Sequence, residues 1–168
     1  MRMDNKFWII GPPGAGKSWL SKNICMRNGC KHVELDNIYW LKAWSRRSKK
    51  EFRDIVEETL NSESWVVDGY YNQVNDLILV HEPTVVLLKN NIIVLLIRVL
   101  LRSLTRILFR KKVCGNNYET IYFAFSKEGI IKYTVEQYKF FKNMTIEGYG
   151  NIFIIESKRA MKKFLKYL

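Results

Sequence analysis

The sequence predicts an α/β fold, in which helices cover both faces of a five-stranded parallel sheet. Short apolar runs alternate with longer amphipathic segments along the chain, a pattern typical of parallel sheets that are buried on both faces. A glycine- and proline-rich turn at 11–16 separates the first apolar run from a helical segment. The chain shows no linker, low-complexity tract or internal repeat, so we expect residues 1–168 to form a single domain.

Five apolar runs are the candidate strands. Each is short and continuous, as expected of a strand buried on both faces, and polar or turn-forming residues bound it. The candidate strands lie at 7–10, 32–35, 65–67, 84–88 and 151–155.

The segments between these runs carry helix signals. Residues 17–27 follow the glycine-rich turn and are expected to form the first helix. Ser48 and Glu51 form a capping box that starts another helix, since Glu51 stands three residues after a good N-cap residue. Residues 89–150 predict a long helix, a polar turn and a second helix. The capped helix carries its apolar residues at a spacing of about 3.6, at Phe52, Ile55, Val56 and Leu60.

One apolar run raises the question of a membrane. The run 92–97 is bracketed by Lys89 and Arg98, whereas a helix that spans a bilayer needs about 20 apolar residues. We therefore expect a buried core helix here and no membrane partner, with an interfacial helix as the alternative.

The composition limits the class of protein. The chain has 28 Lys and Arg against 16 Asp and Glu, a net charge of +12, but 48% hydrophobic residues are too many for a disordered basic tail. The cysteines, Cys25, Cys30 and Cys114, include no CxxC pair, so we expect free thiols and a cytoplasmic location. The four apolar residues at 7–10 are too few for a signal peptide.

The motif Gly-x-x-x-x-Gly-Lys-Ser at 11–18 predicts a nucleotide-phosphate site, the P-loop. Glycines are needed because the backbone N–H groups wrap a phosphate at angles that a Cβ would obstruct. The N-terminus of the following helix adds partial positive charge. Lys17 is expected to reach the β- and γ-phosphates of the nucleotide, and the Ser18 hydroxyl to bind Mg²⁺. The nucleotide is expected to contact Gly11, Pro12, Pro13, Gly14, Ala15, Gly16, Lys17, Ser18 and Trp19.

Acidic residues follow the second and third candidate strands. Glu34 and Asp36 are two residues apart, so on a strand their side chains point the same way, toward the ligand edge of a parallel sheet. Asp36 is a candidate to accept the proton of an acceptor hydroxyl or to orient that hydroxyl, and Glu34 is a candidate to hold a Mg²⁺-bound water. Asp68 is a candidate to hold Mg²⁺ through water. Capping of a turn is the alternative for each aspartate, and His32 and His81 have no partner at metal-ligand spacing.

A run of basic residues follows the fourth candidate strand. Residues 83–118 contain no acid. The arginines in this run recur every four residues, so on a helix they form one stripe that repels itself unless an anion meets it. A triphosphate, a nucleic-acid backbone and solvent with counterions are the candidate partners of this stripe. Its members are Arg98, Arg102, Arg106 and Arg110.

Four blocks of the sequence resemble the bacterial DNA topology modulation proteins, a branch of the adenylate kinase-like P-loop kinases. The blocks are GPPGAGKSWL at 11–20, HVELDNIYW at 32–40, WVVDGYYN at 65–72 and RVLLR at 98–102. The resemblance implies a P-loop NTPase fold like that of nucleoside monophosphate kinases, with the P-loop strand in the centre of the sheet. It also implies a helical lid at about 106–125.

The resemblance further implies bound ATP and Mg²⁺, with an acceptor near Asp36, Tyr39, Trp40, Asp68, Gly69 and Tyr71. The chain departs from the pattern at two kinds of position. Adenylate kinases follow the Asp-Gly pair with an arginine that grips the acceptor's phosphate, and here Tyr70 follows Gly69. Ile78 and Lys89 stand where relatives tend to have an Arg and an Asp. Arg46 and Arg47 are candidate substitutes for the missing arginine.

Together these patterns predict an ATP-dependent phosphotransferase that acts on a nucleotide, a nucleoside or another small hydroxyl or phosphate acceptor. Lys17, Asp36, Arg106 and Arg110 are the candidate catalytic residues, and Ser18, Asp68 and Glu34 the candidate metal ligands. The aromatic segment with Tyr39, Trp40 and Trp44 is either a wall for the acceptor ring or core cover. The alternative function is a nucleotide-binding regulator that contacts nucleic acid through residues 98–112, and the oligomeric state stays open.

Overall fold

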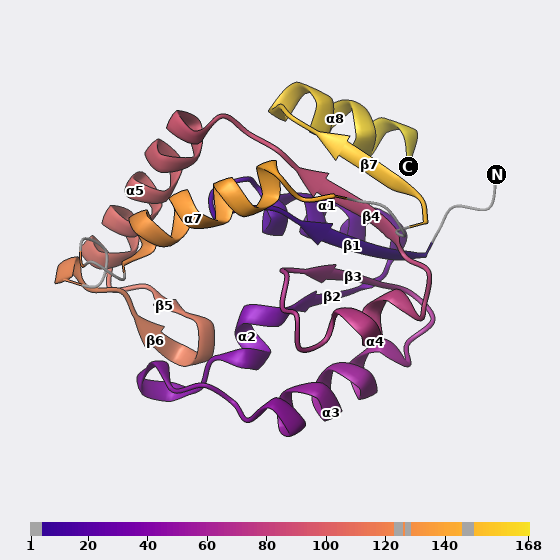
Figure 1. Ribbon diagram of the computed structural model, residues 1–168, viewed down its shortest axis with the longest axis horizontal. Helices are drawn as coiled ribbons and strands as arrows, with labels where there is room; N and C mark the ends of the chain where they lie inside the picture. The colour runs from indigo at the N-terminus through magenta and orange to yellow at the C-terminus, as the bar shows by residue number, and fades with distance from the viewer. Residues whose placement is uncertain (1–4, 123–125, 127–128, 146–149) are drawn as a thin grey trace.

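The computed structural model describes residues 5–122, 126, 129–145 and 150–168. Its main sheet has five parallel strands in the order β2-β3-β1-β4-β7, which confirms the predicted α/β fold (Figure 1). The P-loop strand β1 is central, as the resemblance implies. The strands are β1 (Lys6–Ile10), β2 (Lys31–Glu34), β3 (Trp65–Asp68), β4 (Thr84–Leu88) and β7 (Ile152–Ile155).

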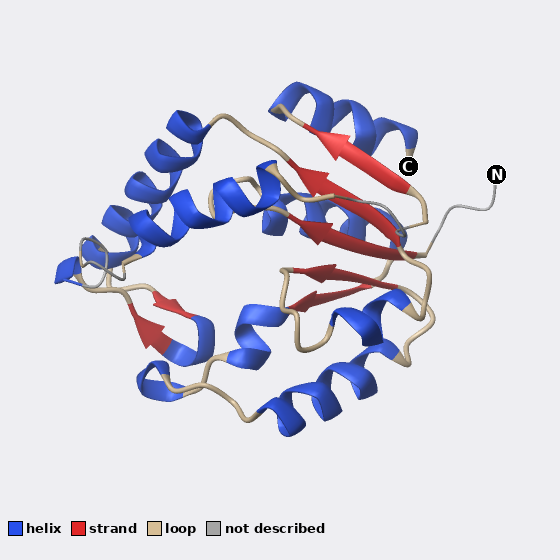
Figure 2. Cartoon of the chain, in the orientation of Figure 1, coloured by secondary structure: helices blue, strands red, loops and turns tan. Residues whose placement is uncertain are grey.

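Helices cover both faces of the sheet (Figure 2). Alternate residues of β1 belong to the core clusters on the two faces. Phe7 of β1 belongs to a core cluster built with α1 (Lys17–Asn28), α5 (Ile92–Leu108) and α8 (Lys158–Tyr167). Trp8, the next residue, belongs to the opposite cluster. The helices that contribute to this second cluster are α2 (Leu35–Tyr39), α3 (Lys49–Leu60), α4 (Asn75–Leu79) and α7 (Ile130–Lys142).

The second strand differs from its prediction. β2 ends at Glu34, and Leu35 already starts the short helix α2, where its side chain is fully buried. Asp36 therefore lies on a helix, and the prediction that Glu34 and Asp36 point the same way from one strand is wrong. The short helix α4 was also not predicted.

The predicted lid contains a hairpin in its described part. After α5, the strands β5 (Lys112–Val113) and β6 (Asn117–Tyr118) pair antiparallel around a 3₁₀ turn, η2 (Cys114–Asn116). The sequence had indicated only a polar turn here. Residues 123–125, at the end of the predicted lid, lie outside the described residues.

The long helix α5 is amphipathic. Its residues Leu95, Val99 and Ser103 are buried, which confirms a helix packed against the core, but Ile97 and Leu101 on the opposite face are more than half exposed. Within the described part of the chain, no helix has both the length and the apolar character needed to cross a membrane.

The start of α3 provides a test of how local sequence fixes this fold. The Ser48 side chain accepts a hydrogen bond of 3.2 Å from the Glu51 N–H, as the capping box predicts. We expect Ser48→Ala to lower the free energy of unfolding by about 1 kcal/mol, because one helix-end N–H loses its partner. Denaturant unfolding measures this change. Ser48→Asp keeps a cap and should remain near wild type, and equal losses in both variants would contradict the assignment.

Candidate active site

The loop between β1 and α1 packs closely against the end of β4 and against α5. A Cβ at Gly11 would lie 2.7 Å from the Leu88 carbonyl oxygen, and one at Gly14 would lie 2.9 Å from the Leu95 carbonyl oxygen. Both glycines have positive φ, at 145° and 79°, and Gly16 starts α1 with a φ of 100°. The loop thus has the backbone that a phosphate cradle requires, and only glycine fits at Gly11 and Gly14.

Lys17 is folded over this loop. Its Nζ donates hydrogen bonds to the carbonyl oxygens of Gly11 at 2.9 Å and Pro12 at 3.3 Å. Burial lowers the pKa of Lys17, while the nearby charges of Asp68 and Asp36 act in the opposite direction. The ammonium group is therefore held against the loop, and the charges of both carboxylates that the sequence singled out act on it. Ser18 and Trp19 are exposed in the first turn of α1.

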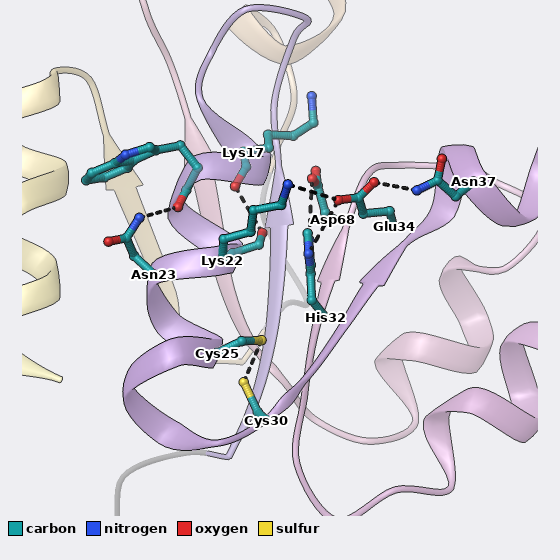
Figure 3. A network of polar contacts seen from close by, with 11 residues as sticks. Lys17, Lys22, Asn23, Cys25, Cys30, His32, Glu34, Asn37 and Asp68 are labelled. Carbon is teal, nitrogen blue, oxygen red and sulfur yellow. Dashed lines mark hydrogen bonds and ion pairs between the residues drawn. The ribbon is translucent and has the colours of Figure 1, made fainter. Parts of the chain in front are cut away.

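Asp68 and Glu34 are linked by a histidine that the sequence analysis set aside. His32 Nδ1 lies 3.4 Å from Glu34 Oε1, and His32 Nε2 lies 3.8 Å from Asp68 Oδ2, as Figure 3 shows. Asp68 is only 6% exposed, and the buried Nε2 atom has no hydrogen-bond partner. The signal was hidden because it depends on the pairing of β2 with β3, which places Glu34 beside Asp68.

The donor set suits a magnesium ion held largely through water and phosphate. Among the described residues, no group of three or more His, Cys, Asp or Glu side chains converges on one point to hold a metal. Mg²⁺ keeps several waters and is usually bound by one or two carboxylates together with substrate phosphates. Ser18, Asp68 and Glu34 fit that mode of binding, and the unpartnered His32 Nε2 lies beside them.

Asp36 faces a second group of side chains. Its Oδ1 accepts a hydrogen bond of 2.5 Å from the Tyr71 hydroxyl. Burial and the Asp36 charge raise the pKa of Tyr71. They also raise the pKa of Tyr133, on α7, to about 12. The same two causes raise the pKa of Cys114, in the hairpin turn, to about 11. At neutral pH all three therefore stay protonated and are potential hydrogen-bond donors around one carboxylate.

Most of the arginine stripe turns inward. Arg98 donates to the Gly14 carbonyl oxygen at 3.2 Å and so braces the phosphate loop. Arg106 pairs with Glu119, an acid one residue beyond the acid-free run. Burial lowers the pKa of Arg102, whose Nε is buried without a partner. Arg110 is exposed after the end of α5. This placement gives no support to a nucleic-acid surface along the helix.

The aromatic segment meets the lid hairpin. Asn117 of β6 donates from its side-chain amide to the Leu41 carbonyl oxygen at 2.8 Å, and its Oδ1 accepts from the Trp44 N–H at 3.0 Å. A Cβ at Gly115 would overlap the Trp40 carbonyl oxygen. The hairpin is thus closed onto this segment, and Trp40 and Trp44 serve as its docking surface in this state.

The other aromatic residues near Asp36 pack together. Tyr39 contacts both Phe52 and Tyr71 through their rings, with centroid distances of 5.2 and 4.7 Å. Gly69 accepts a 2.8 Å hydrogen bond from the Trp8 indole N–H, which fixes the turn after Asp68. These contacts fix the aromatic side chains near Asp36 and the turn after Asp68.

A separate cavity of about 280 Å³ lies on another side of the phosphate loop. Pro12 and Asn90 line it, but neither Lys17 nor Asp36 does. Asn90 is linked to the loop, because its Oδ1 and the Gly14 carbonyl both accept from Arg98.

Comparison with known proteins gives short sequence matches. No protein-family model matches the chain. The chain is 33% identical over 69 residues to the uncharacterized protein YqaC of Bacillus subtilis, a match that covers 40% of this chain and 39% of YqaC. It is 36% identical over 64 residues to human replication factor C subunit 1, covering 38% of this chain and 5% of that protein. The matches span less than half of each relative's length, and they do not show a family.

Comparison of structures covers the whole fold. A gluconokinase from Sinorhizobium meliloti superposes with a TM-score of 0.58 at 13% identity, over 99% of this chain and 90% of that one. A shikimate kinase from Acinetobacter baumannii gives 0.55 at 14% identity, over 98% and 90%. The chain has the fold of the P-loop kinases. Membership of the DNA topology modulation family is not shown by these comparisons.

The closed hairpin yields a prediction about the lid. Gly115 has a φ of 66° and packs against Trp40, so Gly115→Val should prevent the hairpin from docking. We expect a change in tryptophan emission, because Trp40 and Trp44 lose their cover, with a loss of global stability below about 1 kcal/mol, since opening of a mobile surface element costs little. Gly150→Val is the control, because nothing lies within 4 Å of a Cβ there. Unchanged emission in Gly115→Val would contradict the docked hairpin.

Proposed function

We propose that this protein transfers the γ-phosphoryl group of ATP to a hydroxyl group of a small molecule. The observation that carries the proposal is the phosphate loop with Lys17 folded over it, its Nζ bonded to the carbonyl oxygens of Gly11 and Pro12. Burial lowers the pKa of Lys17, and the charges of Asp68, Asp36 and Arg102 also act on it, although these residues come from three other elements. Phosphoryl transfer needs mainly positioning and compensation of charge, and this group combines two cations with two carboxylates.

The donor side is the loop at 11–18 with the N-terminus of α1. Its backbone N–H groups and Lys17 would hold the β- and γ-phosphates, and Lys17 would exchange its two carbonyl partners for phosphate oxygens. Ser18, Asp68 and Glu34 would hold magnesium, which supplies charge neutralisation between the β- and γ-phosphates when bound. The exposed Ser18 hydroxyl is accessible for this contact.

The acceptor side is built around Asp36. The Tyr71 hydroxyl occupies Oδ1, and no hydrogen bond from the described residues reaches Oδ2. Oδ2 is therefore the atom that would accept the proton of the acceptor hydroxyl as it attacks the phosphorus. The Tyr71 contact holds the Asp36 carboxylate in position.

Arg102 and Lys17 would stabilise the negative charge of the migrating phosphoryl group. They replace Arg106 and Arg110, which the sequence had indicated as catalytic cations. The Nε atom of Arg102 is buried without a hydrogen-bond partner. Besides burial, the Arg102 charge also lowers the pKa of Lys17. Arg106 is already held by Glu119, and Arg110 is exposed. A phosphate that reached Arg106 would first have to displace Glu119.

The names of the structural neighbours support a small-molecule acceptor. They include a gluconokinase, a shikimate kinase and a sugar kinase. The likeness itself shows the fold, and the acceptor of this chain is inferred from its own residues.

Removal of either cation tests the proposal. We expect Lys17→Ala and Arg102→Gln each to lower kcat on the order of 100-fold or more, because each removes a charge next to the transferred group. Phosphoryl transfer from labelled ATP to a panel of sugars, polyols and nucleosides provides the measurement. Arg159→Gln removes an exposed arginine of α8 and should keep wild-type activity. Wild-type protein that transfers no phosphate, and hydrolyses ATP no faster than Lys17→Ala, would refute the proposal.

His32 gives a second test on the metal side. We expect His32→Leu to weaken Mn²⁺ binding about 10-fold in the presence of a non-hydrolysable ATP analogue, since residues that orient metal-binding carboxylates have effects of this size. Mn²⁺ paramagnetic resonance measures binding without turnover. His32→Asn retains a side-chain donor and should recover part of the affinity. His81→Leu is the matched control, because His81 contacts Lys6 and Trp65 away from the site; equal effects of His32→Leu and His81→Leu would exclude a local role.

A further inference from the structure

The charges around Asp36 restrict the chemistry of the acceptor. We infer that the acceptor is an uncharged, hydroxyl-bearing molecule, a neutral sugar, polyol or nucleoside, and not one that carries a phosphate or carboxylate. This inference rests on the proposed function and narrows it to one substrate class. It follows from the partners of the arginine and lysine side chains in residues 35–80, which we call the acceptor side.

The half-buried arginines of this region are occupied by the protein itself. Arg53 donates to both oxygens of Asp76 at 2.7 Å and to the Gln73 carbonyl oxygen at 2.6 Å. Arg47 donates to the Ile38 carbonyl oxygen at 2.8 Å and pairs with Glu51. Two planar guanidinium groups are thus used to tie α3 to neighbouring segments, and freeing either one breaks several hydrogen bonds at once.

The remaining cations of this region lie on its surface. Arg46 stacks on the Trp40 ring at 5.7 Å from its centroid, on the docking surface of the hairpin. Arg46 and Arg47, the two candidate substitutes for a phosphate-gripping arginine, therefore both have other partners. The three lysines of the region, Lys42, Lys49 and Lys50, are exposed.

The cations that do act on the groups around Asp36 belong to the donor side. Lys17 and Arg102 interact with the Asp36 charge, and Arg106 acts on Cys114. They come from α1 and α5, and the bound triphosphate would engage them. A second phosphate on the acceptor would then face the like charge of Asp36, and the two would repel each other. Among the described residues 35–80, the cations that could offset this repulsion are arginines held by other partners and lysines on the surface.

The side-chain groups available to bind the acceptor are uncharged tyrosine hydroxyl groups and aromatic rings. The hydroxyl groups of Tyr71 and Tyr133 stay protonated at neutral pH. Tyr71 stands two residues after Gly69, and its hydroxyl donates to Asp36 Oδ1. A hydroxyl-rich ring matches this set, because its hydroxyl groups can donate to Asp36 Oδ2 and to the Tyr71 oxygen and can accept from Tyr133.

Matched pairs of acceptors that differ in charge alone provide the test. The wild-type protein is assayed with saturating Mg²⁺ and ATP on nucleosides against their 5′-monophosphates, and on sugars and alditols against the corresponding sugar acids. We expect kcat/KM for the neutral member of the accepted pair to exceed that of the charged member by at least 10-fold. A preference for the charged member overturns the inference and leaves the proposed function standing. The absence of transfer to every compound overturns the proposed function, and the inference with it.

A variant that adds a cation within range of the Asp36 charge tests the physical cause. Tyr133→Arg should reduce the preference for the neutral acceptor at least 3-fold, because it adds a positive charge that offsets Asp36. Tyr133→Phe removes the hydroxyl without adding charge, and Tyr167→Arg adds the same charge on an exposed position of α8. Neither control should reduce the preference. An unchanged preference in Tyr133→Arg, in a variant whose thermal unfolding shows that it is folded, would contradict charge as the basis of selection.

Discussion

The close packing of the phosphate loop against β4 and α5 is the constraint on which the rest of the site depends. Gly11 fits under the Leu88 carbonyl and Gly14 under the Leu95 carbonyl, with no room for a Cβ at either position. Arg98 adds a hydrogen bond from α5 to the Gly14 carbonyl. Because α5 is fixed to the loop in this way, the next inward arginine along the helix, Arg102, is brought within electrostatic range of Lys17. The loop thereby positions both the nucleotide site and the helix that completes it.

The two carboxylates near Lys17 differ in their environments and so in their proposed roles. Asp68 is buried at the end of a central-layer strand and faces His32, which suits a residue that holds a metal ion through water. Asp36 is exposed toward the lid and has one oxygen occupied by Tyr71, which suits a residue that orients an incoming hydroxyl. The charges of both carboxylates act on one cation, Lys17. The separation of metal and acceptor chemistry thus follows from the different elements, β3 and α2, that carry the two acids.

Sequence reasoning succeeded where a local pattern has one physical solution. The spacing of Gly11, Gly14 and Gly16 before Lys17 fixes a phosphate loop, and short apolar runs fix strands that are buried on both faces. It failed where the outcome depends on distant contacts. The helix at Leu35 forms because that side chain is buried against the core, and the role of His32 depends on the register between β2 and β3.

The arginine stripe shows the same limit. Its period was evident from the sequence, but which way it faces is decided by the packing of Leu95 and Val99 against the loop. The pairing of Arg106 with Glu119 removed one expected catalytic cation, and the burial of Arg102 supplied another.

The contact between the lid hairpin and the aromatic segment has a consequence for how the chain folds. Asn117 and Trp44 are 73 residues apart in the sequence, and their contact requires the sheet to bring α5 and α2 to opposite sides of the site first. Docking still orders the hairpin at a cost in conformational entropy, and only a few hydrogen bonds offset that cost. The hairpin is therefore expected to dock last during folding and to behave as a separate unit of amide exchange, opening with a much smaller free energy than the central strands.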